Sequence, residues 1–315
     1  MNQDVMERIL RCPTLPSLPA VAVRVIELTS NVHVSLNDLA GTIQNDQAVA
    51  AKILRTVNSS FYGLRRPCAT INQALVMLGL STVKSLALSF SLVATLGAGA
   101  QGGFDYVSYW RRSLYTAVGA RCLARSTGIT EGEDEAFLGG LLQDVGMVAL
   151  HQVLGSDYLR VILQTGGDHR KLVKCELAAL EVQHPEIGAA LAQRWKLPNE
   201  LIIPVRYHER PTAAPPVHAD LVRCVGMGNI AHDILTDDNP APALDRFRAR
   251  AAEWFDLDAR ISDDLIKKIA EGVRQITPLF RLPTGSFSDI DAVMDRLAVA
   301  PTRATVSEAV CMVCP

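Results

Sequence analysis

The sequence predicts an all-α fold in two helical subdomains, with their border near residues 95–105. Apolar residues recur at spacings of three and four along nearly the whole chain, which is the period of a helix with one buried face. The spacing is clear in Val21, Val25, Ile26 and Leu28, and again in Val49, Ile53, Leu54 and Val57. No segment alternates apolar and polar residues as a half-buried strand would. We therefore expect about a dozen helices and essentially no sheet.

Capping residues mark where several helices begin. The hydroxyl of Ser35 can cap the turn that starts at Leu36. Thr70-Ile71-Asn72-Gln73 has the spacing of a capping box. Another helix is expected to open at Ser81, after a glycine that can end the preceding one. Asn58 lies at a helix end, where a polar side chain most often bridges to a backbone carbonyl rather than contacting a ligand.

Three stretches interrupt the helical pattern. Gly97 to Gly103 follows a helix and lacks the Lys-Ser/Thr ending of a phosphate-binding loop, so it predicts a hinge between the subdomains. Arg210 to Pro216 and Asp237 to Pro242 contain prolines that break helices. An N-terminal helix is expected within residues 1–14, and a partly ordered tail over residues 283–315.

The composition is that of an ordinary globular protein. The 315 residues are 49% hydrophobic and 20% charged, and the net charge of −2 gives no strong attraction to nucleic acid. The seven cysteines do not have the spacing of a disulfide framework, which favours a reducing cytoplasm. Cys311 and Cys314 form a C-x-x-C pair in the tail without a second pair, so no metal or redox role is expected there.

Neither a membrane span nor a secretory leader is expected. No stretch reaches the ~18 uncharged apolar residues that a span needs. The segment Met1 to Leu10 carries Asp4 and Glu7 and has no apolar core.

The stretch Gly140-Leu141-Leu142-Gln143-Asp144-Val145-Gly146 is the most informative part of the chain. It resembles the metal-binding signature of the HD-type phosphohydrolases, with Gln143 where that signature has a histidine. The resemblance implies a metal that activates water and polarises a phosphoryl oxygen. A neutral amide is a poor ligand for a transition metal. The motif therefore indicates that the hydrolase scaffold is kept while its metal chemistry is lost. The apolar residues of the motif also form the buried face of a helix.

Further stretches resemble the HDOD domain, an output-type, degenerate relative of the HD phosphohydrolases. These are Leu15 to Pro19, Ile43 to Leu54, Val57 to Gly63, Ile71 to Leu80, Trp110 to Ser113, Glu181, His184, Gly188, and Trp195 to Pro198. The resemblance covers most of residues 15–280, and we expect a first helical subdomain over 15–95 and an HD-like one over 104–280. We also expect the large rings of Phe61 and Tyr62 to pack the first subdomain onto the second.

The resemblance assigns six positions to the hydrolase metal site. The first histidine falls at Arg112, the His-Asp pair at Gln143-Asp144, two later histidines at His184 and His208, and the late aspartate at Asn229.

Three of these positions are altered. Asp144, His184 and His208 could still hold zinc. Arg112 stays protonated and would repel a cation. We expect it to pair with Asp144 in a charge-assisted bridge, so that no metal and no other cofactor is needed. Otherwise His208 caps a helix carbonyl, and His184 belongs to a helix start before Pro185.

The leading functional hypothesis is a non-catalytic bacterial signalling module that binds a protein partner or a small regulatory ligand, in the cleft between the subdomains. The first alternative is a metal-dependent phosphohydrolase acting on a nucleotide or cyclic dinucleotide. The second is a DNA-binding regulator. A faint helix-turn-helix pattern spans Ala74 to Leu88, but its second helix has the composition of a core, so nucleic acid is an unlikely partner.

Overall fold

The computed structural model describes residues 3–29, 35–97, 102–129, 132–282, 284 and 295. Within this part of the chain every regular element is a helix and no strand occurs, which confirms the all-α prediction. Most of the Gly97 to Gly103 hinge and of the 283–315 tail, including Cys311 and Cys314, lies outside the described residues. The expected N-terminal helix is α1 (Gln3–Leu10).

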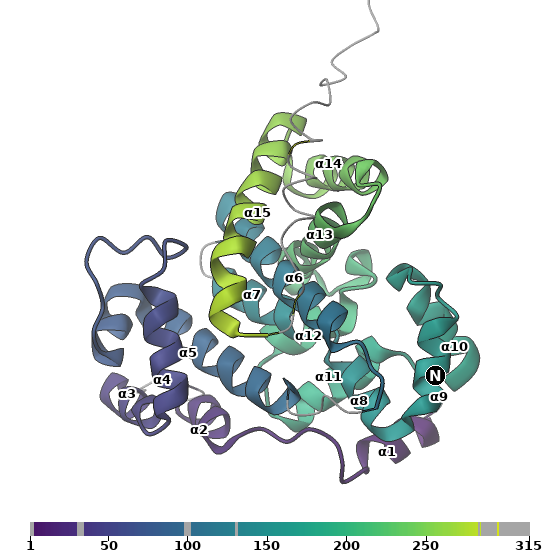
Figure 1. Cartoon of the computed structure of the whole chain (residues 1–315), viewed down its shortest axis with the longest axis horizontal. Coiled ribbons are helices and arrows are strands. Elements are labelled where there is room, and N and C mark those ends of the chain that lie inside the picture. Colours follow the sequence, from purple (N-terminus) through teal and green to yellow (C-terminus); the bar gives the residue numbers. More distant parts are fainter. Residues whose placement is uncertain are drawn as a thin grey trace, which may run out of the picture.

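The first group of helices lies at one side of the molecule (Figure 1). It comprises α2 (Ala20–Thr29), α3 (Leu36–Gln44), α4 (Gln47–Val57) and the start of α5 (Ile71–Gly97), which the other three contact. Their shared core includes Leu39, Ile43, Ile53 and Ile71. Gly79 interrupts α5 with φ 85° and ψ 172°, a conformation that only glycine adopts readily, so the expected break before Ser81 is present.

The second group is built around α6 (Tyr106–Ser126), which packs against α7 (Glu133–Leu142), α13 (Ala219–Thr236) and α15 (Ala259–Phe280). The close approach depends on glycines. A Cβ atom on Gly140 would lie 2.9 Å from the Cα of Ala117, so no side chain fits there. Around this centre lie α8 (Val145–Leu154), α9 (Ser156–Leu163), α10 (Leu172–Leu180), α11 (His184–Arg194), α12 (Asn199–Tyr207) and α14 (Ala241–Phe255).

Two of the expected loops are present, and one of them is filled by short turns. The proline-rich stretch after His208 forms the 3-10 turns η3 (Pro211–Ala213) and η4 (Pro216–His218), and α13 and α14 are separated where Asp237 to Pro242 predicted a break. Asn58 bridges as expected, because its amide donates to the carbonyl of Cys68 at 2.8 Å and accepts from the Cys68 N–H at 2.7 Å.

Polar contacts join the two groups. The guanidinium of Arg121 on α6 is buried, donates to the hydroxyl of Tyr62 at 2.7 Å and lies 3.2 Å from Asp134. It also lies over the rings of Phe61 and Tyr62, with 5.3 and 4.6 Å to their centroids. Thr82 on α5 donates to Asp134 at 2.7 Å. Phe61 and Tyr62 therefore contact the second group, as predicted.

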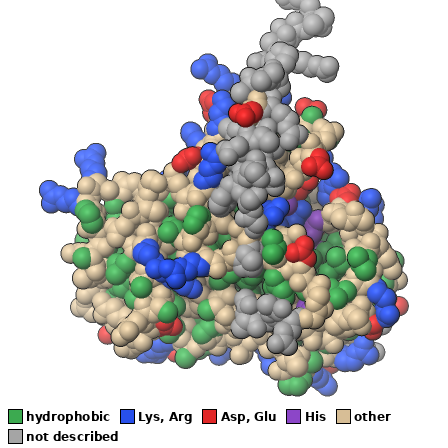
Figure 2. All heavy atoms as spheres, viewed as in Figure 1, with side chains coloured by type: hydrophobic (Ala, Val, Ile, Leu, Met, Phe, Trp, Pro, Cys, Tyr) green, Lys and Arg blue, Asp and Glu red, His purple; other side chains and the backbone are tan. Residues whose placement is uncertain are grey.

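Two helical stretches are long and apolar enough to cross a membrane, against the expectation from the sequence. They are Ile71–Leu96 and Glu133–Leu154, and 61% and 83% of their apolar 18-residue windows are buried in the molecule. The sequence prediction rested on uninterrupted uncharged runs. Lys84 interrupts the first stretch and the short break before α8 divides the second, but each stretch is apolar on average. Such burial is typical of core helices, and on the face shown in Figure 2 charged side chains of both signs are interspersed with apolar ones.

Candidate metal-binding site

Five ionisable side chains from four parts of the second group converge beside the start of α8. Asp144 lies between α7 and α8, His184 begins α11, and His208 and Glu209 follow α12. His169 comes from the 3-10 turn η2 (His169–Lys171). Gly146 lets α11 approach, because a Cβ atom there would lie 1.9 Å from the carbonyl oxygen of His184. Gly146, the last residue of the Gly140 to Gly146 motif, is thus required for bringing His184 close to Asp144.

One oxygen of Asp144 is the centre of this cluster. Its Oδ1 lies 3.3 Å from Nε2 of His184, 3.3 Å from Nε2 of His208 and 3.5 Å from Nε2 of His169. The Nε2 atoms of His184 and His208 are themselves 3.3 Å apart. Oε1 of Glu209 completes the group at 3.3 Å from His169 and 3.7 Å from His208. Asp144, His184 and His208 are buried, whereas His169 and Glu209 lie nearer the surface.

The outer nitrogens of two imidazoles are fixed by the protein. Nδ1 of His184 lies 2.8 Å from Oε2 of Glu176, which also accepts the backbone N–H of His184 at 2.8 Å. Tyr158 donates to the other Glu176 oxygen at 2.6 Å. Nδ1 of His208 lies 2.8 Å from the carbonyl of Val205. Contacts of this kind orient metal-binding histidines in known sites, and here they direct both Nε2 atoms at Asp144.

Mutual attraction shifts the pKa values within the cluster. Burial alone would raise the pKa of Asp144, but the nearby imidazoles of His169, His184 and His208 hold it well below its usual value. Burial would lower the pKa of His184, but Glu176 and Asp144 raise it to about 10. The pKa of Glu209 is lowered to about 2 because His169 and His208 outweigh the effect of burial. Asp144, Glu209 and His184 therefore each favour their charged forms within the cluster.

The donor atoms fit a divalent cation. Oδ1 of Asp144 and Nε2 of His169 are buried and make no hydrogen bond of suitable geometry in the described structure. Two ligands bound to one zinc ion at about 2.0–2.2 Å can lie no more than roughly 4.4 Å apart, and the separations of 3.3–3.7 Å satisfy this limit. Imidazole with carboxylate suits zinc and similar first-row metals. One oxygen of Asp144 would then bind the ion together with three imidazole nitrogens.

The expected bridge between Arg112 and Asp144 is wrong. The guanidinium of Arg112 instead donates to Oδ1 of Asn229 and to Oδ1 of Asp233, each at 3.1 Å. Asp233 lies one helical turn beyond Asn229 on α13, so it faces the same side and supplies the carboxylate that Arg112 needs. Asp144 is surrounded by imidazoles, although the charge of Arg112 still acts on His169, where it opposes the rise in pKa that Asp144 causes.

The altered positions form a network of their own. The amides of Gln143 and Asn229 exchange two hydrogen bonds, each of 2.7 Å, and Thr116 also donates to Asn229 at 3.2 Å. Gln143 links this network to the cluster by donating to Oδ2 of Asp144 at 3.1 Å. All six predicted positions are therefore connected: Arg112, Gln143 and Asn229 in a hydrogen-bonded half, and Asp144, His184 and His208 in an imidazole-carboxylate half.

The sequence analysis missed His169, Glu209, Glu176 and Asp233. His169 lies outside the helical pattern, in a turn whose position relative to Asp144 no local spacing reveals. Two signals were present: Glu209 is adjacent to His208, and Asp233 follows Asn229 by four residues.

The HDOD domain model matches residues 15–211, more than half of the chain, so the protein belongs to the HDOD family. A protein of unassigned function from Treponema pallidum (strain Nichols) is 28% identical over 240 residues, which are 75% of this chain and 45% of the relative. The chain thus spans less than half the length of that relative.

Solved structures share the fold. An HDOD domain protein of unknown function from Geobacter sulfurreducens has a TM-score of 0.69 at 24% identity, covering 89% of this chain and 99% of its own. A protein from Shewanella amazonensis SB2B that is assigned as a phosphohydrolase has a TM-score of 0.68 at 22% identity, covering 89% and 98%. At these identities the likeness concerns the fold alone.

Proposed function

We propose that the protein is a regulatory signalling module that does not hydrolyse phosphoesters. The observation that supports this is the closed network of Arg112, Gln143, Asn229 and Asp233, which occupies positions where the resemblance to the hydrolases requires metal ligands. The polar atoms of the paired amides already have partners within the protein. Half of the hydrolase site is thereby replaced by a structural hydrogen-bonded element, and hydrolysis that needs a metal held by all six positions is not supported.

The test is an assay of nucleotides and cyclic dinucleotides with Zn²⁺, Mn²⁺ or Mg²⁺ added. We expect no turnover above that of buffer containing the same metal. Metal-dependent turnover that Asp144→Ala abolishes would overturn the proposal and establish the phosphohydrolase alternative.

A second property is favoured by the other half of the site. We propose that Asp144, His169 and His184, whose donor atoms all lie within 4.8 Å of one another, hold one divalent cation, with His208 and Glu209 beside them, and this replaces the expectation of a site without metal. His208 lies 3.3 Å from both Asp144 and His184 and would complete the closed four-ligand shell of a structural zinc site, whereas a catalytic site keeps a position open for water. When bound, the metal would supply positive charge to Asp144 and stabilise the fold.

Metal analysis of the purified protein tests this directly. We expect close to one equivalent of transition metal, lost in His184→Ala and retained in His218→Ala, which removes a histidine of η4 outside the cluster. Absence of metal from a folded wild type incubated with Zn²⁺ would show that the imidazoles serve only to pair with Asp144.

DNA binding through α5 is not supported. The second half of that helix is buried at Val83, Leu86, Ala87 and Phe90, so it cannot enter a groove without unfolding the interface with α7.

A further inference from the structure

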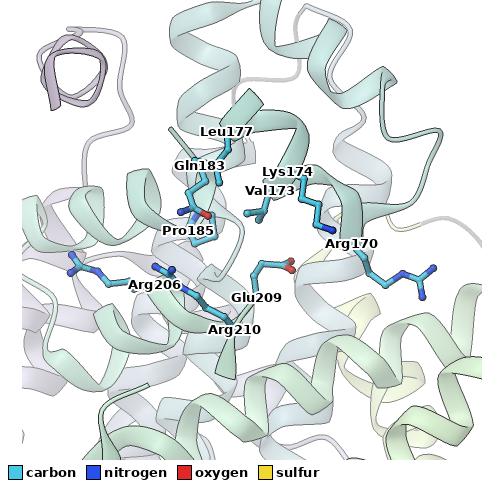
Figure 3. A pocket seen from close by; sticks show the side chains of 9 residues that line it. All are labelled: Arg170, Val173, Lys174, Leu177, Gln183, Pro185, Arg206, Glu209 and Arg210. Atoms are coloured by element: carbon cyan, nitrogen blue, oxygen red, sulfur yellow. The ribbon is translucent and has the colours of Figure 1, made fainter. Parts of the chain in front are cut away.

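A pocket with a cavity volume of about 290 Å³ lies beside the cluster, between α10 and the end of α12 (Figure 3). Four cationic residues line it: Arg170, Lys174, Arg206 and Arg210. Glu209 is its only carboxylate. In Figure 3, Lys174 and Glu209 extend into the space from opposite sides. The lining is therefore cationic in excess, in a molecule whose net charge is −2.

Arg170 is paired with Asp168 at 2.8 Å, but the rest of this positive charge is only partly neutralised by neighbours. Glu209 is occupied by His169 at 3.3 Å. Among the described residues, neither Lys174 nor Arg206 forms an ion pair, and the Nε atom of Arg206 is buried without a hydrogen-bond partner. Arg210 has only a distant partner, with 3.6 Å to Glu186. The buried Nε atom of Arg206 needs a partner, and the exposed cations beside it add positive charge, so the pocket favours an anion.

Apart from Gln183, the rest of the lining is apolar. It consists of Val173, Leu177 and the buried Pro185. The volume lies at the lower end of the roughly 300–1,000 Å³ that is usual for small-molecule sites. A pocket of this size favours a ligand no larger than a mononucleotide over a cyclic dinucleotide.

We propose that this pocket binds a small phosphate monoester with an apolar or aromatic body, of the size of a nucleoside monophosphate. The phosphate lies among Lys174, Arg206 and Arg210, and the body packs on Val173 and Leu177. The inference deepens the proposed regulatory function by naming the class of its ligand. Glu209 lines the pocket and contacts His169 and His208, so it joins the ligand to the imidazole-carboxylate cluster.

Calorimetric titration of the full chain tests the pocket with four probes: AMP, adenosine, inorganic phosphate and cyclic di-GMP. We expect AMP to bind, adenosine and inorganic phosphate each to bind at least tenfold more weakly, and cyclic di-GMP to bind no better than inorganic phosphate. Lys174→Ala, an exposed substitution that spares the fold, should weaken AMP binding about tenfold, and Arg206→Ala should do the same. Lys171→Ala removes the same charge three residues from Lys174 and outside the pocket, and should change affinity less than twofold.

Other results would overturn the inference. Failure of AMP to bind at millimolar concentration, or equal losses in Lys174→Ala and Lys171→Ala, would show that the pocket is not a phosphate monoester site. Tighter binding of cyclic di-GMP than of AMP would contradict the size argument. The same samples are assayed for hydrolysis: AMP that binds and is cleaved refutes the non-hydrolytic function but leaves the pocket intact, whereas no binding and no cleavage refutes the pocket alone.

Discussion

Gln143 and Asn229 exchange two amide hydrogen bonds of 2.7 Å, one in each direction, between the end of α7 and the middle of α13. The pair stands where a hydrolase of this fold would, by the resemblance, place a histidine and an aspartate. Each amide uses both a donor and an acceptor, and Asn229 also accepts from Arg112 and Thr116. The donors and acceptors of the two amides therefore satisfy one another without a cation between them.

The reciprocal pair should contribute to stability. Asn229→Ala leaves the buried amide of Gln143 without two partners, which typically costs about 1–3 kcal/mol of unfolding free energy. Urea denaturation followed by circular dichroism measures this. Gln275→Ala, which removes an exposed amide that pairs with Glu271, should stay within about 0.5 kcal/mol of the wild type. Equal stability of the two variants would mean that the pair is dispensable.

Glu176 should determine how tightly the cluster holds a metal, because it fixes the imidazole of His184. Glu176→Gln keeps the shape but removes the charge, and we expect metal affinity to fall about 10–100-fold. Competition with a chromophoric chelator gives the affinity. The control is Glu200→Gln, on the exposed start of α12, which should bind metal as the wild type does. Unchanged affinity in Glu176→Gln would rule out this positioning role.

The altered half of the site should become metal-binding when its three replaced ligands are restored. The triple variant Arg112→His, Gln143→His, Asn229→Asp restores the three ligands that the resemblance predicts, while Asp233 keeps Arg246 at 3.5 Å. We expect the metal content to rise by up to one equivalent over the wild type, measured by elemental analysis. A folded triple variant with unchanged metal content would show that the frame no longer places these positions around an ion.

Arg121 should be essential for joining the two groups of helices. Arg121→Met leaves the carboxylate of Asp134 buried without its cation, and such a change typically costs about 3–5 kcal/mol. Arg125 provides the matched control, since its side chain is 58% exposed and its pairing with Glu133 is worth at most about 1 kcal/mol. Thermal and urea unfolding measure the stability of both variants. Similar losses of unfolding free energy would contradict the role of Arg121 in joining the two groups of helices.

His232 should make the protein less stable in mild acid. Burial and the charge of Arg112 lower its pKa from 6.5 to about 4, although Asp233 acts in the opposite direction. The unfolded chain therefore binds a proton below pH 6.5 that the folded chain does not bind until about pH 4. This stability is fully present above pH 6.5 and is lost as the pH falls towards 4.

The variant His232→Asn should flatten that dependence. Between pH 7 and pH 5 we expect the variant to lose about 1–2 kcal/mol less unfolding free energy than the wild type. Denaturant titrations at several pH values measure both proteins. Parallel curves would show that His232 does not titrate differently on folding.

The sequence by itself determined the helical class, the caps and the family. Helical periodicity and capping are local, so the break at Gly79 and the bridging amide of Asn58 could be predicted from neighbouring residues. The motif around Gln143 and Asp144 identified the frame because it is a contiguous string. The family resemblance, carried over position by position, placed His184 and His208 at the site, where both lie 3.3 Å from Asp144.

Only the tertiary structure decided which charged and polar side chains pair with one another. Arg112 was expected beside Asp144, but α6 and α13 pack so that Asn229 and Asp233 reach its guanidinium first. His169 reaches Asp144 from a turn that no periodicity marks, at 3.5 Å across 25 residues of chain. Ion pairs depend on separations of a few ångströms between helices distant in sequence. Those separations follow from packing, and a one-dimensional pattern does not contain them.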